Sequence, residues 1–261
     1  MARPLVSIVI RCKNGMKFVD ACLKSVFQTR YNPIEIIFVD DASTDGTPEY
    51  VRSKYGNLIR LVKLPKTSGP TKASNIGTIL SKGKYVAYLD VDTQVTPTWL
   101  DAPIKLLEKK SRVGAIQCKI FFTKGGIDSI GHYLHILGYP LKRTFFNADP
   151  EVPSEIFGGK QAAMIFRKSA LKEVGYFDEN IFFLFEESDL CWRLLLRGYR
   201  IIYVPNSVVY HHGGGTTGPY KYFIAYMRQK NTLYSMIKNY EVKTLLKIMP
   251  CLLYTSPSPR D

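Results

Sequence analysis

The arrangement of apolar and polar residues along the first 110 positions predicts strands and helices in regular alternation. Short runs of consecutive apolar residues predict buried strands, and apolar residues spaced three and four apart predict amphipathic helices. The predicted strands cover residues 6–10, 35–39, 59–64 and 85–89. The predicted helices start near residues 18, 47, 71 and 96, with Asn14 as the expected cap of the first. This order favours an α/β fold, with a mostly parallel sheet flanked by helices on both faces.

The pattern is less regular in the rest of the chain. Residues 121–153 are rich in glycine, proline and aromatic residues, which predicts loops and short strands. Further strands are predicted at 161–166, 200–204 and 208–211, and further helices at 169–174, 188–196 and within the basic stretch 220–249. We therefore divide the chain into a first half (1–115), a second half (116–218), a basic helical segment (219–250) and a tail (251–261). The tail resembles a translated adapter and does not enter the fold prediction.

Composition narrows the classes of protein that fit. A hydrophobic content of 46% excludes a disordered chain. Lysine and arginine number 36 against 22 acidic residues, and the resulting charge of +14 favours a polyanionic partner such as nucleic acid, an anionic membrane surface or a phosphorylated ligand. No run approaches the roughly 20 apolar residues of a membrane span. The five cysteines form no C-x-x-C pair, and we expect a cytoplasmic protein.

Two predicted strands of the first half end in paired carboxylates. In such sheets ligands bind at the carboxyl ends of the strands. Asp90 and Asp92 form a D-x-D whose carboxylates can share one face and bind Mg²⁺ or Mn²⁺; the alternative is a solvated loop. Asp40 and Asp41 can accept hydrogen bonds from a base or a ribose, and the alternative is a turn centred on Asp45.

The second half contains two further candidate groups. Three carboxylates, Glu186, Glu187 and Asp189, follow an aromatic run, and crowding near apolar rings raises a carboxyl pKa as a general base requires. The alternative is an ordinary acidic first helical turn. His211 and His212 precede a run of glycines, which suits a metal ligand beside a phosphate-binding loop; the alternative is a structural role.

The basic C-terminal segment mixes aromatic and aliphatic residues with lysines. Such a helix can lie on an anionic bilayer, and we expect peripheral association with the inner face of the cell membrane. The alternative is a helix that packs on the domain with its charges in solvent.

Together and in this order, the motifs resemble glycosyltransferase family 2, the inverting nucleotide-sugar transferases of GT-A fold, over residues 4–239. The resemblance is carried by the opening strand with Asn14 and by the segments 38–47, 69–77, 88–92, 175–178, 185–190 and 204–211. The most similar branch contains rhamnosyltransferases and related enzymes that build lipid-linked surface polysaccharides.

The resemblance implies roles for individual residues. Asp40 and Asp41 hold the base and ribose, Asp90 contacts ribose and metal, and Asp92 binds the metal. His211 completes the metal shell, while Arg11 and Lys72 are assigned to the donor. Glu187 is implied as the general base, at a position where the family has aspartate, and Asp189 is the alternative base.

The implied activity is metal-dependent, inverting transfer of a sugar. The donor is UDP-, dTDP- or GDP-linked, the cofactor is Mg²⁺ or Mn²⁺, and the acceptor is a hydroxyl of a glycan or polyprenyl-linked glycan. The alternative is a catalytically degenerate nucleotide-binding or scaffold protein of the same fold. A dehydrogenase or nucleotidyltransferase is disfavoured because neither G-x-G-x-x-G after the first strand nor G-x-x-x-x-G-K-[ST] occurs. No zinc-finger or RNP-like motif supports nucleic-acid binding.

Overall fold

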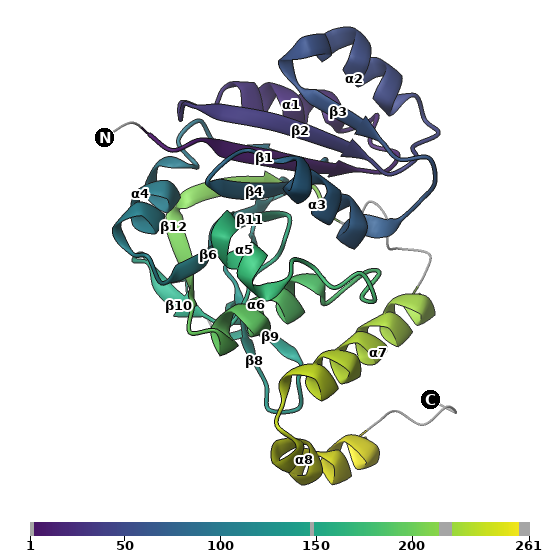
Figure 1. The fold of residues 1–261 in the computed structure, drawn as a ribbon, viewed down its shortest axis with the longest axis vertical. Coiled ribbons are helices and arrows are strands. Elements are labelled where there is room, and N and C mark those ends of the chain that lie inside the picture. The colour runs from purple at the N-terminus through teal and green to yellow at the C-terminus, as the bar shows by residue number, and fades with distance from the viewer. Residues whose placement is uncertain (1–2, 147–148, 214–220, 256–261) are drawn as a thin grey trace.

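The computed structural model describes residues 3–146, 149–213 and 221–255, and is built around one large mixed sheet (Figure 1). The strands are β1 (Val6–Cys12), β2 (Ile34–Asp40), β3 (Arg60–Lys63), β4 (Tyr85–Asp90), β5 (Thr93–Val95), β6 (Val113–Phe122), β7 (Ile127–Ser129), β8 (His132–Leu134), β9 (Pro140–Lys142), β10 (Ser154–Ile156), β11 (Ala163–Arg167) and β12 (Arg200–His211). The α-helices are α1 (Val19–Phe27), α2 (Thr47–Tyr55), α3 (Gly69–Leu80), α4 (Asp101–Lys109), α5 (Lys168–Val174), α6 (Glu186–Leu196), α7 (Lys221–Asn239) and α8 (Val242–Thr255). Short 3₁₀ turns lie at Gly56–Leu58 and Arg143–Phe146.

The sheet has the order β10-β12-β6-β11-β4-β1-β2-β3, with β5 beside β12 and β7 beside β6. Strands β3, β2, β1 and β4 are parallel, as the alternating pattern predicts. The reversed strand β11 joins them to β6 and β12, so that six of the ten strands run in one direction. The predicted mostly parallel α/β architecture is confirmed. The division after residue 115 falls within β6, and both halves share the sheet.

Consecutive apolar residues in the central strands are explained by burial on both faces of the sheet. Side chains of a strand alternate between the two faces. Ile8 and Ile10 pack into a cluster with α1, α2 and α4, whereas Val9 packs on the opposite face with α3, α5 and α6. Because helices cover β1 on both faces, most of its residues are apolar and consecutive, and its polar residues are Ser7 and Arg11.

The structure corrects three local predictions. Asn14 does not cap α1; it adopts a left-handed conformation (φ 52°), and its side-chain oxygen accepts the Thr44 N–H at 2.9 Å. The helix expected from residue 96 begins at Asp101, after a turn in which the Trp99 N–H donates to the Thr96 carbonyl at 3.2 Å. The two strands predicted over 200–211 form the single strand β12, whose register shifts between Val204 and Val208.

The C-terminal helices α7 and α8 lie at the end of the molecule opposite α2 and β3 (Figure 1). Their inner residues Met236 and Ile248 pack with Trp192 of α6 in a small separate cluster. No helix in the described part of the chain has the length and hydropathy that a membrane span requires. Residues 251–255 of the expected tail continue α8, and residues 256–261 lie outside the described part of the chain.

Gly77 allows α3 to pack closely on β1. A Cβ atom at this position would lie 2.3 Å from Cγ1 of the buried Val9.

We expect Gly77→Ala to lower the free energy of unfolding by about 1–3 kcal/mol, measured by urea denaturation, because the well-packed interface must separate. Ile79→Ala on the exposed face of the same helix is the control, expected within about 0.5 kcal/mol of the parent. An unchanged midpoint for Gly77→Ala would show that the interface is loose.

Candidate functional site

The carboxyl ends of the central strands bring the candidate residues to one edge of the sheet. Strands β1, β2 and β4 are parallel, and their last residues are in register. Cys12 lies beside Asp40 of β2, and Arg11 lies beside Asp90 of β4. The local pattern of strand followed by acid is therefore enough to place Asp40 and Asp90 at this edge, on the two strands that flank β1.

Asp90, Asp92 and His211 form a cluster whose ligand atoms all lie within 4.8 Å of one another. Pairing of β5 with β12 brings them together, and the His212 N–H donates to the Asp92 carbonyl at 2.9 Å. The Nε2 atom of the His211 imidazole lies 3.3 Å from the Asp92 carboxylate. Two carboxylates and one imidazole are a donor set that suits Mn²⁺ and, through the oxygens, Mg²⁺. The residues present therefore fit the implied metal.

A carboxylate and a lysine outside the cluster hold His211 in position. Its Nδ1 lies 2.7 Å from the Asp128 carboxylate, which also pairs with Lys160 Nζ at 2.7 Å. A carboxylate behind a histidine orients the ring and leaves Nε2 as the ligand atom. Burial lowers the pKa of His211, but Asp128 and Asp92 outweigh it and raise the pKa to about 9. Asp128 and Lys160 were not predicted from the sequence, because both belong to stretches without a periodic pattern of apolar residues.

Arg11 connects the cluster to the acidic pair. Its Nε donates to Asp90 Oδ1 at 3.0 Å, and its Nη1 donates to Gln161 at 2.6 Å and lies 3.8 Å from Glu186. Burial lowers the pKa of Arg11, but the two carboxylates raise it overall. The resemblance assigns Arg11 to the donor, whereas here its N–H groups bind side chains of the site. Lys72, the other expected cation, is exposed on α3.

Glu186 and Glu187 begin α6 on the far side of Arg11. Glu186 is 5% exposed, and its Oε2 has no hydrogen-bond partner among the described residues, whereas Glu187 remains partly exposed. Burial raises the pKa of both carboxyl groups. The charges of Arg11, Asp90 and Lys160 also act on Glu187. Crowded carboxyls tend to differ in protonation, so one can stay neutral while the other accepts a proton.

The turn before this pair has an unusual backbone. Leu184 and Phe185 are consecutive and both left-handed, with φ of 67° and 76°. This conformation costs about 1–2 kcal/mol per residue for amino acids other than glycine. Such residues persist only where their surroundings hold them, and they cluster at functional sites.

Asp189 has a structural environment. It is fully buried, and its carboxylate accepts hydrogen bonds from Arg193 (2.8 Å), Lys238 (3.1 Å) and Asn239 (3.0 Å). Lys238 and Asn239 belong to α7, so Asp189 attaches α7 to α6. Both carboxylate oxygens of Asp189 are therefore engaged, whereas Glu187 is partly exposed.

The two acids at the end of β2 also differ in whether a carboxylate oxygen is left without a partner. Asp40 is fully buried; its Oδ2 accepts the Ser43 N–H at 3.0 Å, and its Oδ1 has no partner within the described part of the chain. Asp41 accepts the N–H groups of Ser68 (2.6 Å) and Gly69 (2.9 Å), which fixes the start of α3. Asp40 thus retains an acceptor that suits a ligand, while both oxygens of Asp41 are already engaged.

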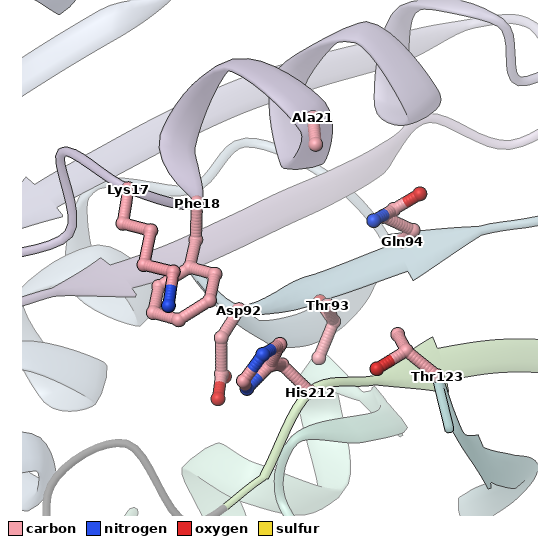
Figure 2. A pocket seen from close by; sticks show the side chains of 8 residues that line it. All are labelled: Lys17, Phe18, Ala21, Asp92, Thr93, Gln94, Thr123 and His212. Carbon is pink, nitrogen blue, oxygen red and sulfur yellow. The ribbon is translucent and has the colours of Figure 1, made fainter. Parts of the chain in front are cut away.

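A pocket of about 220 Å³ opens beside the cluster (Figure 2). The Phe18 and His212 rings that line it lie 4.8 Å apart, between centroids. Lys17 supplies a cation and Asp92 an acid to the same pocket, which suits a polar group held next to a bound metal. Its lining comprises Lys17, Phe18, Ala21, Asp92, Thr93, Gln94, Thr123 and His212. Residues 214 and 215 of the glycine run lie outside the described residues.

A family model, Glycosyl transferase family 2, matches residues 7–175 of the chain. Among curated proteins, the poly-β-1,6-N-acetyl-D-glucosamine synthase of Staphylococcus aureus is 29% identical over 209 residues, which cover 77% of this chain and 48% of that protein. The chain thus spans about half the length of the curated relatives it matches.

Solved structures share the fold. The mannosyltransferase PcManGT from Pyrobaculum calidifontis, in complex with GDP-Man and Mn²⁺, has a TM-score of 0.69 at 17% identity, over 99% of this chain and 77% of that one. Residues 1–349 of S. aureus TarS in complex with UDP give a TM-score of 0.64 at 18% identity, over 96% of this chain and 72% of that one.

The contact between Asp128 and His211 predicts that Asp128 affects metal affinity without binding the metal itself. We expect Asp128→Asn to weaken Mn²⁺ binding by about 10- to 100-fold, measured by isothermal titration calorimetry, because the histidine loses its orienting carboxylate. Asp149→Asn is the matched control, since Asp149 also pairs with a lysine, Lys119, but lies outside the cluster. Equal Mn²⁺ affinity for both variants would contradict the assignment.

Proposed function

Because the chain belongs to glycosyl transferase family 2, we propose that it is a metal-dependent, inverting glycosyltransferase of surface polysaccharide synthesis. The predicted family and GT-A fold are confirmed by the family match and the structural neighbours. The observation that carries the proposal is the arrangement at the sheet edge: the cluster of Asp90, Asp92 and His211 is connected through Arg11 to the pair of Glu186 and Glu187.

The donor is a nucleotide-linked sugar. Asp40 Oδ1 is a buried acceptor for the base or ribose, and the pocket beside Asp92 has room for the polar part of the donor. When bound, the metal neutralises charge on the departing diphosphate. A UDP-linked N-acetylhexosamine is the first donor to test, because one curated relative is a poly-β-1,6-N-acetyl-D-glucosamine synthase and the TarS structure contains UDP. GDP- and dTDP-linked sugars are the alternatives.

The acceptor is a hydroxyl of a glycan or of a lipid-linked glycan, and Glu187 removes its proton. Glu187 keeps an exposed surface for the acceptor, whereas Glu186 is buried beside Arg11. Arg11 holds Asp90 and Glu186 in fixed relation across the site. Attack opposite the departing nucleotide needs one base and no enzyme nucleophile, so the anomeric configuration inverts without a covalent intermediate.

We expect Glu187→Gln to lower turnover by about 10²- to 10⁴-fold while UDP affinity stays within about twofold, because the amide cannot accept the proton. Turnover is measured with UDP-N-acetylglucosamine, GDP-mannose and dTDP-rhamnose in the presence of Mn²⁺, and NMR gives the anomeric configuration of the product. Glu173→Gln is the control, since Glu173 is exposed and bonds only Tyr199 among the described contacts.

Three outcomes are informative. Parallel loss of turnover and UDP affinity in Glu187→Gln would indicate a structural role for Glu187. A wild-type protein that binds UDP and Mn²⁺ but transfers none of the sugars would favour the degenerate nucleotide-binding alternative. A retained anomeric configuration would contradict the single displacement.

The outer faces of α7 and α8 form a surface that we propose rests on the anionic inner face of the cell membrane. On α8, Val242, Leu246 and Met249 are exposed at spacings of four and three, flanked by the exposed Lys243 and Lys247. A helix with an exposed apolar stripe bordered by lysines suits an anionic bilayer. On α7 the exposed apolar residues are Tyr222, Phe223, Tyr226, Leu233, Tyr234 and Ile237.

Binding to this membrane surface depends on charge. We expect the protein to float with vesicles that contain phosphatidylglycerol and not with pure phosphatidylcholine. The double variant Lys243→Glu/Lys247→Glu should lose most of this binding, at about 1 kcal/mol or more per reversed charge. The control Lys109→Glu/Lys110→Glu makes the same charge change at the end of α4. Equal loss in both variants would show a non-specific effect of net charge, and absent flotation would contradict the membrane proposal.

A further inference from the structure

The turn that leads into Glu186 is held by a side chain of α7. Asn231 is 1% exposed, and its Nδ2 donates to the carbonyl oxygens of Phe183 and Leu184, each at 2.8 Å. These carbonyls belong to the turn with two consecutive left-handed residues, Leu184 and Phe185. An amide nitrogen with two N–H groups can serve two carbonyls at once, which an aliphatic side chain of the same size cannot do.

The preceding residues are held by a side chain of α3. The hydroxyl of Thr71, also 1% exposed, lies 2.6 Å from the Ile181 carbonyl and 3.1 Å from the Phe182 carbonyl. Two buried side chains therefore face the carbonyls of residues 181–184. Residues that cost conformational energy persist where surrounding contacts fix them, and Asn231 supplies those contacts at the strained positions.

We propose that Asn231 is a positioning residue that fixes the placement of Glu187 through this turn. The inference rests on the proposed transfer reaction, in which Glu187 is the base. Asn231 lies outside residues 7–175 that match the family model. A second attachment, from Lys238 and Asn239 to Asp189, fixes α7 to α6 itself. Loss of Asn231 thus frees the turn while α7 stays attached.

The test compares Asn231→Leu with Thr232→Val in the full chain. Thr232 is the next residue of α7, equally buried, and its hydroxyl has no partner within the described residues. We expect Asn231→Leu to lower kcat by about 10- to 100-fold, with KM for the donor sugar and UDP affinity within about twofold, because a misplaced base impairs chemistry and not donor binding. Thr232→Val should match the wild type.

Two further measurements separate positioning from general destabilisation. Hydrogen–deuterium exchange should rise in the peptide 181–190 of Asn231→Leu and stay unchanged over β1 and β4. Leu184→Gly added to Asn231→Leu should recover part of the lost kcat, because glycine adopts the left-handed conformation without cost. If Asn231→Leu does not fold, Asn231→Ser, which retains one donor, replaces it with a smaller expected loss.

Wild-type kcat in Asn231→Leu with unchanged exchange would overturn the inference, as would equal loss of kcat and UDP affinity without recovery by Leu184→Gly. These outcomes are distinct from failure of the proposed function, in which the wild-type protein itself transfers no sugar. The exchange measurement requires no turnover and therefore tests the turn in either case.

Discussion

A buried arginine allows several carboxylates to share one small space. Arg11 is about 10% exposed at its side chain and lies between Asp90 and Glu186, so each acid has a cation beside it. Without that cation, carboxylates from β4 and α6 would face one another in a low-dielectric site and repel. Removing one member of a buried ion pair costs about 3–5 kcal/mol, because the remaining charge is left unpaired. The relation between the metal cluster and the acidic pair therefore depends on Arg11.

The remaining charges of the site divide into those that build it and those left for ligands. Asp41 fixes the start of α3, Asp189 attaches α7, and Asp128 orients His211. The carboxylate oxygens without partners among the described residues include Asp40 Oδ1 and Glu186 Oε2. This division explains why a site so rich in acids can fold: most of the negative charge is neutralised by lysine, arginine or backbone N–H groups before a ligand arrives.

Much of the sheet edge was predictable because its signals are local. A run of apolar residues followed by an acid identifies a buried strand and its ligand-binding end, and parallel pairing brings those ends together. The contacts that position the site are not local. His211 meets Asp128 across 83 residues and Asn231 meets Leu184 across 47, with no spacing that marks either pair in the sequence. The contacts of Arg11 and Asp189 were not predictable for the same reason, since their partners come from distant parts of the chain.

We propose that one metal, held by Asp90, Asp92 and His211, would meet the donor diphosphate in front of Glu187. Anomalous diffraction at the manganese edge, from crystals grown with Mn²⁺ and UDP, tests it directly. We expect an anomalous peak within coordination distance of Asp92 and His211 Nε2, with the UDP diphosphate on the same ion. Manganese bound elsewhere, or UDP seated away from Asp40, would contradict it.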